Sequence, residues 1–210
     1  MAKKILKDYT NISLKLKTPT QCLNFKHIFG RTASVNVEIG SGKGTFLLSQ
    51  AKLHQQSDFL GIEWANKYYR FAVDRIGRWN LTNVRIIRTD AAVFLAQNLQ
   101  SESIDCFHIY FPDPWPKKRH HKRRFICKPN ILQMIRCLKR AGRINIATDH
   151  AEYFEQITNT IQACINAKTA EHTEFISPDA AGENELVGTN YERKYIKDER
   201  KIYTTAIRKI

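Results

Sequence analysis

The 210-residue sequence lacks the features that mark a membrane protein or a disulfide-stabilised secreted protein. No segment approaches the roughly 18 consecutive apolar residues that a membrane-spanning helix needs. The five cysteines are scattered and form no C-x-x-C pair, which predicts reduced thiols, no disulfide framework and no metal site. The first residues are basic but lack the apolar core of a signal peptide. We therefore expect a cytoplasmic protein without a membrane partner.

Acidic residues are scarce relative to basic ones. Lys and Arg number 34 against 20 Asp and Glu, which gives a net charge of +14. An excess of this size favours an anionic partner, nucleic acid ahead of a membrane surface. The chain also has no internal repeat and no low-complexity tract, and its length suits one large domain.

Strand-like and helix-like segments alternate from residue 35 onward. Runs of β-branched and aromatic residues predict strands at 35–39, 59–63, 84–88, 104–111, 143–147, 171–176 and 201–208. Apolar residues at helical spacing predict helices at 45–53, 65–79, 91–99, from Pro129 to a stop near Gly142, and around 153–165. The alternation predicts an α/β, Rossmann-type, mostly parallel seven-stranded sheet with an antiparallel edge strand and helices on both faces.

We expect residues 35–210 to form this one domain, with a polar loop between the last two strands. Residues 1–34 are mixed and turn-rich. They fit either a mobile arm that becomes ordered on a partner or a simple cover for the sheet. Their sequence does not separate the two.

A glycine-rich loop follows the first predicted strand, where residues 38–44 read E-I-G-S-G-K-G. Glycine lets a loop turn tightly and lets a ligand approach the backbone. The spacing differs from the G-x-G-x-x-G of dinucleotide-binding loops, and Glu38, two residues before the first glycine, would repel a pyrophosphate. The same carboxylate could pair with an ammonium group. S-adenosylmethionine, a cationic nucleoside without phosphate, therefore fits the loop better than NAD.

Three further carboxylates lie where later strands end. Glu63, Asp90 and Asp113 follow the second, third and fourth predicted strands. In an open α/β sheet these ends meet at the ligand-binding edge, where acids can accept hydrogen bonds from ribose hydroxyls or an adenine amino group. Glu63 and Asp90 also suit helix N-capping, so either one alone is ambiguous. Together with Glu38 the series is more typical of a cofactor rim.

The segment after the fourth strand carries the strongest local pattern: residues 110–124 read Y-F-P-D-P-W-P-K-K-R-H-H-K-R-R. The prolines stop the strand and stiffen the turn that presents Asp113 beside Trp115. Lys117–Arg124 comprises six Lys or Arg and two His. An acid beside a flat aromatic ring and a run of cations suits a polyanionic substrate, although many charge runs are only solvated surface. The two histidines have too few further ligands nearby for a metal site.

With these motifs together, the sequence resembles the bacterial-type tRNA (guanine-N7)-methyltransferase family, which modifies a guanine in the tRNA variable loop. The resemblance covers residues 29–210. It rests on V-E-I-G-S-G-K-G at 37–44, F-L-G-I-E-W at 59–64, T-D-A at 89–91, the segment at 110–124, A-T-D-H at 147–150 and G-T-N-Y-E-R-K-Y at 188–195. The proline–aspartate segment and the late T-x-Y-E are specific, whereas many methyltransferases share the glycine loop.

The resemblance implies a class I fold that uses S-adenosylmethionine to methylate N7 of guanine 46 in tRNA. It implies a catalytic role for Asp113 and cofactor contacts at Glu38, Gly40, Glu63, Asp90 and Asp113. It implies substrate contacts at Lys117, Asp149, Thr189, Asn190, Tyr191 and Glu192. It implies RNA contacts at Arg119, His120, His121, Lys122, Arg123 and Arg124. Nothing in the sequence demands a partner subunit, so we expect a self-sufficient monomer or homodimer.

Guanine N7 carries a lone pair and no proton, so its methylation depends on alignment more than on a base. Asp113 and Asp149 would then orient the guanine edge, or Asp113 would hold the cofactor cation. Asp149 with Glu152 also fits a capping box, and residues 189–192 also fit a polar surface loop. Three rival functions remain: a methyltransferase for another RNA position, a non-catalytic RNA-binding protein on this scaffold, and an NAD-dependent oxidoreductase, which the glycine spacing disfavours.

Overall fold

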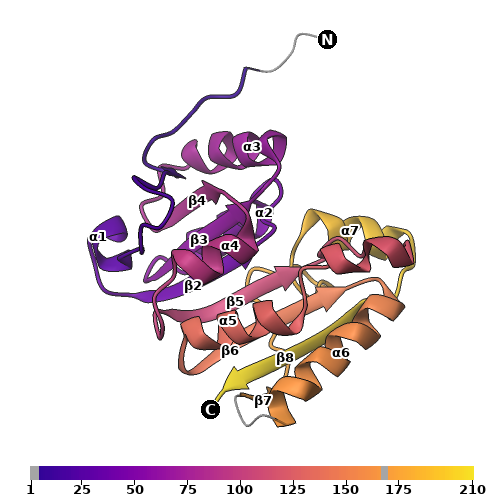
Figure 1. The fold of residues 1–210 in the computed structure, drawn as a ribbon. Helices are drawn as coiled ribbons and strands as arrows, with labels where there is room; N and C mark the ends of the chain where they lie inside the picture. The colour runs from indigo at the N-terminus through magenta and orange to yellow at the C-terminus, as the bar shows by residue number, and fades with distance from the viewer. Residues whose placement is uncertain (1–4, 167–169) are drawn as a thin grey trace.

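The computed structural model of the chain describes residues 5–166 and 170–210. Residues 1–4, part of the predicted N-terminal segment, lie outside the described residues. The described residues form one sheet of eight strands with helices on both faces (Figure 1). The strand order is β1-β4-β3-β2-β5-β6-β8-β7. None of the helices in these two ranges is long and apolar enough to cross a membrane.

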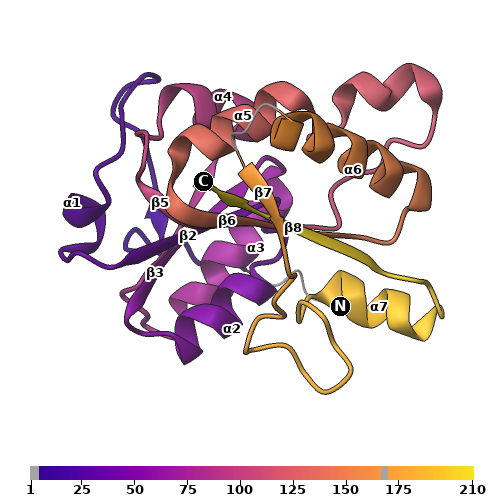
Figure 2. The same cartoon turned by 90° about the horizontal axis from the view of Figure 1, so that it is seen from below.

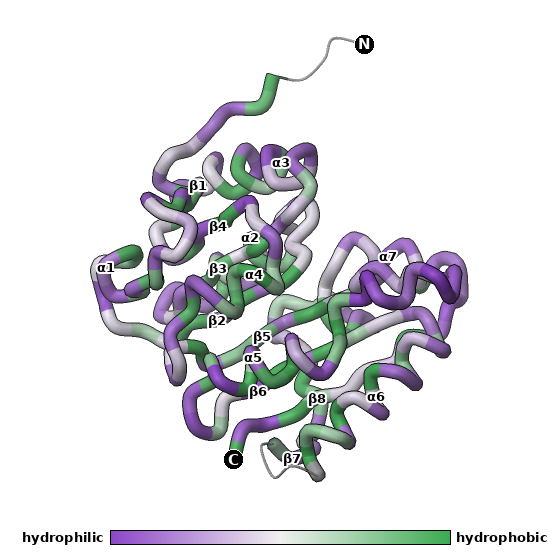
Figure 3. Tube along the Cα trace, in the orientation of Figure 1, coloured by the Kyte–Doolittle hydropathy of each residue, from purple (hydrophilic) through white to green (hydrophobic). Residues whose placement is uncertain are grey.

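Five parallel strands form the centre of the sheet. They are β2 (Ser34–Ile39), β3 (Ser57–Glu63), β4 (Val84–Arg88), β5 (Ile104–Tyr110) and β6 (Leu138–Thr148). Their side chains are largely buried, as strands covered on both faces require. Figure 3 shows the apolar residues concentrated on these strands, whereas α7 (Asn190–Lys197) is hydrophilic. Because the five strands are parallel, their carboxyl ends share one edge.

The remaining strands differ in part from the prediction. β8 (Tyr203–Lys209) is antiparallel, as predicted for one strand, but it lies between β6 and the edge strand β7 (Ala170–Thr173). An eighth strand, β1 (Ser13–Leu14), pairs in parallel with β4 at the opposite edge. A two-residue strand has no alternation of apolar and polar residues, so its pattern could not be detected.

The helices form two layers separated by the sheet (Figure 2). The first layer contains α2 (Thr45–Leu53) and α3 (Asn66–Gly77), with α7 on the same side. The second contains α4 (Ala91–Gln97), α5 (Lys128–Cys137) and α6 (Ala151–Asn166). Each layer encloses its own group of buried apolar side chains, which fixes the helices on the sheet by the hydrophobic effect.

Residues 5–34 pack against the sheet. Ile12 is fully buried beneath α3, and the Tyr9 ring lies so close to Gly77 that a Cβ there would come within 2.1 Å of it. Further along, Leu23 and Phe25 join the core on the other face, where α1 (Phe25–Phe29) begins. In the described residues, this segment therefore covers the sheet.

Two predictions of secondary structure are wrong: the end of one helix and the absence of another. α5 ends at Cys137, and Gly142 lies inside β6 instead of stopping the helix. Leu138 already pairs with Ile104 of β5, so strand pairing overrides the helical pattern. The segment predicted as a polar loop before residue 201 contains α7, whose polar sequence has too narrow an apolar stripe to be distinguished from a loop.

Candidate active site

The candidate site lies where the carboxyl ends of the parallel strands meet. Two cavities open there. The larger, of about 570 Å³, extends across the ends of β3, β4 and β5 and includes Glu63, Asp90 and Asp113. The smaller, of about 160 Å³, lies between the glycine loop and α7 and includes Glu38. The four acids that were predicted to form a cofactor rim therefore line these two cavities.

The glycine loop depends on left-handed backbone. Gly40, Gly42 and Gly44 have φ angles of 78°, 52° and 68°, values that glycine adopts without a steric penalty. Gly44 is required for packing as well, because a Cβ there would lie 2.9 Å from the Cβ of Ala72. The loop thus brings bare backbone to the wall of the smaller cavity.

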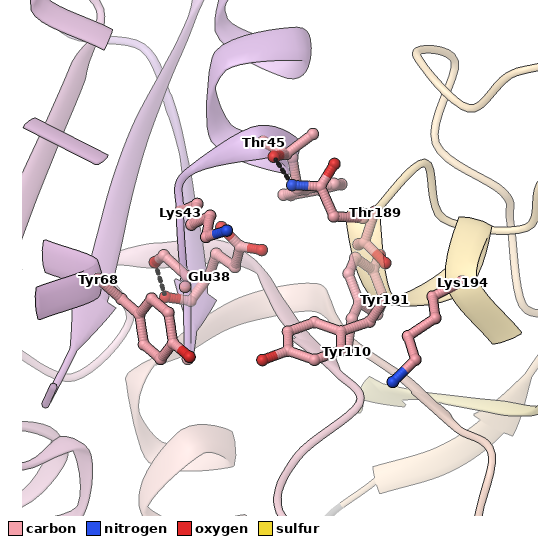
Figure 4. Close-up of a pocket in the computed structure, with 13 residues that line it drawn as sticks. Glu38, Lys43, Thr45, Tyr68, Tyr110, Thr189, Tyr191 and Lys194 are labelled. Carbon is pink, nitrogen blue, oxygen red and sulfur yellow. Dashed lines mark hydrogen bonds between the residues drawn. The ribbon is translucent and has the colours of Figure 1, made fainter. Parts of the chain in front are cut away.

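Glu38 is a buried carboxylate in the wall of the smaller cavity (Figure 4). Its Oε2 atom has no hydrogen-bond partner among the described residues. Burial raises the pKa of Glu38 to about 8, an effect that Ser41 opposes and Glu63 reinforces. A buried carboxylate is costly unless a cation or a hydrogen-bond donor reaches it. Glu38 therefore offers a site for a positively charged group of a ligand.

Glu63 and Asp90 differ in how the backbone holds them. Glu63 accepts hydrogen bonds from the Gly42 N–H at 2.8 Å and the Ala65 N–H at 2.7 Å. Glu63 therefore holds the glycine loop against the end of β3. It is not the N-cap of α3, because that position is occupied by Ala65. Asp90 is the N-cap of α4 and accepts from the Val93 N–H at 3.0 Å. The capping interpretation thus holds for Asp90, which also lines the larger cavity.

The proline-rich turn after β5 brings Asp113 to the larger cavity. Phe111 and Trp115 have φ angles of 53° and 44°, a conformation that is unusual for bulky residues and recurs at functional sites. The Arg123 guanidinium lies 4.9 Å from the centre of the Trp115 ring, and His120 packs against the same ring at 5.8 Å. The Asp113 carboxylate is exposed and accepts no hydrogen bond from the described residues.

The basic run forms a short 3-10 helix, η1 (Lys118–Arg123), beside the larger cavity. Its cationic side chains at Lys118, Arg119, Lys122 and Arg123 are exposed, and those of His120 and His121 are half-buried. These groups can reach an anionic substrate. Within residues 5–166 and 170–210, no cluster of three His, Cys, Asp or Glu could hold a metal ion.

Arg124, predicted to contact RNA, is buried instead, with a side chain only 1% exposed. Its guanidinium donates to the Pro114 carbonyl at 2.8 Å and to Gln156 Oε1 at 2.7 Å. It also pairs with Glu152 of α6 and lies over the Tyr153 ring. Arg124 therefore attaches the proline-rich turn to α6. A run of identical charges gives no indication of which member faces inward.

The late T-x-Y-E motif begins α7. Thr189 is the N-cap and accepts from the Glu192 N–H at 3.1 Å. Glu192, predicted to contact substrate, is fully buried, and its carboxylate accepts from the N–H groups of Leu186, Val187 and Gly188. Because both carboxylate oxygens are engaged in this way, Glu192 holds the loop before α7 and does not face the cavity.

Other residues at the start of α7 form the far wall of the smaller cavity, opposite Glu38 (Figure 4). Asn190 donates to the Thr45 hydroxyl of α2 at 2.8 Å, which joins α7 to the glycine-loop side of the site. Tyr191 is half-exposed, and Lys194 lies one turn further along the helix. The predicted substrate residues Asn190 and Tyr191 are thus brought opposite the predicted cofactor residues.

Lys117 and Asp149 line neither cavity, within the chain that the structure describes. Lys117 is exposed just before η1. Asp149 does not cap α6: His150 does, accepting from the Tyr153 N–H at 3.2 Å. The Asp149 carboxylate instead pairs with Arg200 at 2.8 Å. The capping-box alternative for Asp149 is therefore wrong.

A buried polar chain behind the site escaped prediction. The Tyr110 hydroxyl lies 2.8 Å from His108 Nδ1, and His108 Nε2 lies 3.2 Å from the Asn36 amide oxygen. Burial lowers the pKa of His108 to about 3, so the ring is neutral. Because Nε2 must donate to the amide oxygen, Nδ1 accepts and the Tyr110 hydroxyl donates to it. The β-branched and aromatic residues of 104–111 predicted a strand but not this polar chain.

The two cavities meet at residues that line both of them, namely Gly40, Tyr68 and Tyr110. The hydroxyls of Tyr68 and Tyr110 point toward one another below Glu38 (Figure 4). Trp64 belongs to the motif at 59–64 but had no predicted role; it lies next to Glu63 in the larger cavity and is largely exposed. An exposed aromatic directly after a strand-end acid was the available signal.

Comparison with solved structures gives the fold class of the chain. The aminoglycoside resistance methyltransferase NpmB1 matches with a TM-score of 0.61 and 15% sequence identity, over 89% of this chain and 92% of that chain. A 30S ribosomal A1408 methyltransferase from an uncultured bacterium matches with a TM-score of 0.57 and 18% identity, over the same shares. The chain therefore has the Rossmann-type fold of class I S-adenosylmethionine-dependent methyltransferases, as predicted.

Comparison of sequences gives the family. The model of the Methyltransf_4 family, described as "Putative methyltransferase", matches residues 32–205, and the chain belongs to this family. A protein of Thermotoga maritima is 34% identical over 190 residues, covering 90% of this chain and 58% of its own length. Proteins of Rhodopirellula baltica and Nitrosomonas eutropha are 37% and 44% identical over 148 and 131 residues, covering 67% and 62% of this chain.

All three relatives carry the name tRNA (guanine-N(7)-)-methyltransferase, so the resemblance inferred from the motifs is confirmed at the level of the family. The chain spans 55% of the length of the Rhodopirellula protein and 58% of the other two.

Proposed function

We propose that the chain transfers the methyl group of S-adenosylmethionine to N7 of guanine 46 in the variable loop of tRNA. The observation that carries the proposal is the Glu38 carboxylate, buried beside the glycine loop with an unpartnered oxygen. A pyrophosphate would gain no favourable charge from this group in either protonation state, whereas a cationic cofactor supplies the partner that the ionised carboxylate lacks. The name shared by the relatives and the specific motifs support guanine N7 as the acceptor.

The residues of both cavities fit S-adenosylmethionine, which when bound supplies a methyl group activated by a sulfonium. Glu38 would hold its cationic amino-acid end, where Gly40 allows close approach. Glu63 would accept hydrogen bonds from the ribose hydroxyls, and Asp90 from the adenine amino group. Trp64 would pack against the adenine. The carboxylates of this set are held by backbone donors or by burial, so they need little rearrangement on binding.

Tyr110 would lie next to the reacting methyl group, because it lines both the cavity assigned to the amino-acid end and the cavity assigned to the adenosine. Its hydroxyl proton is committed to His108. The oxygen therefore presents lone pairs to the ligand, which favours a cation and its polarised methyl group. Burial raises the pKa of Tyr110 well above its usual value, so the residue stays a neutral phenol.

Asp113 would orient the guanine through its N1–H and N2–H edge from the mouth of the larger cavity. Thr189, Asn190 and Tyr191 would contact the substrate from the opposite side. Since N7 carries a lone pair and no proton, these residues act by alignment, and Asp113 removes no proton from N7. Asp149 would join them only after its pair with Arg200 opens.

The RNA outside the cavities would contact the exposed cations of η1 and Lys117. Arg124 and Glu192 would contribute indirectly, Arg124 by fixing the proline-rich turn and Glu192 by fixing the loop before α7. We propose that the chain acts in the cytoplasm without an obligatory protein partner, as a monomer or a homodimer.

The test is methyl transfer from labelled S-adenosylmethionine to an unmodified tRNA transcript, followed by borohydride and aniline, which cleave the RNA at N7-methylguanine. We expect one cut, at guanine 46. A cut elsewhere would support the rival methyltransferase for another RNA position. Cofactor binding without transfer to any RNA, measured by calorimetry, would favour the non-catalytic RNA-binding protein. Tight binding of NAD in place of S-adenosylmethionine would refute the cofactor assignment.

A further inference from the structure

Residues 43–79, which include α2 and α3, carry exposed positive charge and no exposed acid of their own; from other segments, the exposed Asp8 lines a cavity with Arg70, and Asp179 pairs with His54. Residues 43–79 contain six Lys or Arg, namely Lys43, Lys52, Lys67, Arg70, Arg75 and Arg78, which we call the α2–α3 cationic face. The same segment contains three acids, Asp58, Glu63 and Asp74, and all three are buried. Asp58 pairs with Arg31, and Asp74 pairs with Arg78. No ion pair within the described residues involves the other five cations of this face.

An exposed aromatic ring, Trp79, accompanies these cations. Trp79 is 53% exposed, and Lys52 Nζ lies 3.5 Å from the centre of its ring. Trp79 and the half-buried Phe71 line a cavity of about 300 Å³ together with Lys43, Arg75, Arg78 and Asp74, the acid that pairs with Arg78. Cations alternating with flat rings are the composition of surfaces that hold single-stranded RNA, where phosphates meet the charges and bases stack on the rings.

This cavity adjoins the candidate active site. Lys43 lines both the 300 Å³ cavity and the smaller active-site cavity, opposite α7 (Figure 4). Arg75 donates to the Thr45 hydroxyl at 2.6 Å, the same hydroxyl that receives the hydrogen bond from Asn190 of α7. A strand of RNA that leaves the smaller cavity past Lys43 would therefore meet the α2–α3 cationic face at once.

The other cationic surface, η1, lies on the opposite side of the sheet. Arg124, which follows η1, is bound to Glu152 and Gln156 of α6. Helix α6 belongs to the layer across the sheet from α2 and α3 (Figure 2). The active site is thus flanked by cations on both sides, and the charge run in the sequence accounts for only one of them.

We propose that the α2–α3 cationic face is a second RNA-binding surface, which holds the phosphate backbone of the substrate tRNA beyond the methylated guanine while Trp79 stacks on a base. This inference rests on the proposed function for the identity of the RNA. The face favours RNA over an anionic membrane, because its exposed ring, Trp79, lies among cations and not on a continuous apolar stripe.

The test compares two triple variants of the full chain. The first, K52A/K67A/R70A, removes three exposed charges of the face that line neither active-site cavity. The control, K17A/K26A/R140A, removes three exposed charges elsewhere; Lys26 lies on α1 and Arg140 near the amino end of β6, away from the strand ends that carry the site. Binding of an unmodified tRNA transcript is measured by fluorescence anisotropy over a series of KCl concentrations.

We expect the first variant to bind tRNA on the order of tenfold more weakly at 0.1 M salt, with the slope of log K against log salt reduced by about one for each phosphate that the variant no longer neutralises. Its affinity for S-adenosylmethionine should be unchanged, and the control should match the wild type. Unchanged slopes in both variants, or equal reductions in both, would overturn the assignment. So would a variant that keeps tRNA binding but no longer binds phosphatidylserine vesicles.

Substitution of Trp79 provides a second test, independent of the charge variants. W79A should weaken tRNA binding, and W79F, which keeps a flat ring, should restore most of it. Equal binding by W79A and wild type would show that the ring does not stack on RNA. If the wild-type chain binds tRNA but methylates no guanine, the proposed function fails, whereas these slopes still decide whether the face binds RNA.

Discussion

The Tyr110 hydroxyl lies 2.8 Å from Nδ1 of a buried, neutral His108. This pairing directs the hydroxyl proton away from the ligand and the oxygen lone pairs toward it. We expect Tyr110→Phe to weaken binding of S-adenosylmethionine several-fold and leave binding of S-adenosylhomocysteine, which lacks the sulfonium charge and the methyl group, nearly unchanged. Calorimetry with both ligands measures the two affinities. An equal decrease for the two would mean that Tyr110 only packs.

The raised pKa of Glu38 should make cofactor binding depend on pH. At pH 7 the carboxyl group is mostly protonated, since its pKa is about 8, and pairing with a cation requires it to lose the proton. Affinity for S-adenosylmethionine should therefore rise from pH 6 to pH 8 and level off above that, with about one proton released per binding event at pH 7. Calorimetry in buffers of different ionisation enthalpy counts that proton, and Glu38→Gln should abolish its release.

The raised pKa of Glu38 should also make the stability of the fold depend on pH, with stability decreasing where cofactor affinity increases. Between the usual glutamate pKa of 4.5 and about 8, the folded chain keeps a proton that the unfolded chain releases. The free energy of unfolding should therefore fall as pH rises through this window. Urea unfolding of wild type and Glu38→Gln at several pH values separates this contribution, because the variant lacks it. A pH dependence identical in both proteins would contradict the assignment.

Asp113 is exposed at the mouth of the larger cavity, so its replacement should leave the fold intact. We expect Asp113→Ala to abolish methyl transfer while the urea midpoint and the far-ultraviolet circular dichroism match the wild type. Near-normal turnover would show that Asp113 does not orient the substrate. Asp113→Asn separates charge from hydrogen bonding, because it keeps one acceptor without the negative charge.

Arg123 and Arg124 are neighbours in the sequence with different environments. Arg124 is buried against α6, and Arg123 is exposed beside Trp115. Arg124→Ala should lower the free energy of unfolding by about 3 kcal/mol, because it leaves the groups that it holds without partners. Arg123→Ala should leave stability unchanged and weaken tRNA binding. Urea unfolding measures the stability of both variants, and fluorescence anisotropy measures their tRNA binding. Equal effects of the two substitutions on stability would refute the predicted difference.

Glu192 should act on the loop before α7 and not on the substrate directly. Glu192→Ala removes the acceptor for three backbone N–H groups at residues 186–188. We expect hydrogen exchange of those amides to accelerate on the order of tenfold or more, since each then lacks its buried partner. The matched variant Tyr191→Ala should leave this exchange unchanged while raising the KM for tRNA. Unchanged exchange in Glu192→Ala would favour the direct contact predicted from the motif.

The elements predicted correctly from the sequence are those whose residues satisfy a local rule. β4 and α2 have the predicted boundaries because β4 is rich in β-branched residues and α2 begins directly after the glycine loop. The four strand-end acids could be grouped because parallel strands bring their carboxyl ends to one edge. Each of these inferences needs only the order of residues and elements along the chain.

What could not be predicted depends on contacts between distant segments. The partner of Asp149 is Arg200, 51 positions later, and the inward turn of Arg124 depends on residues of α6. The α2–α3 cationic face is spread over residues 43–78, with three acids interspersed in the sequence. Only folding shows that these acids point inward while the cations stay outside.

The position of β8 between β6 and β7 makes the end of the sheet depend on one strand. Among the described strands β7 pairs with β8 alone, so residues 170–173 are joined to the rest of the sheet only through residues 203–209. The chain in between contains α7, which closes the smaller cavity. Without β8, β6 would be an open edge that can pair with another chain. The helix that forms the substrate-side wall of the smaller cavity is therefore followed directly by the strand that protects this edge from aggregation.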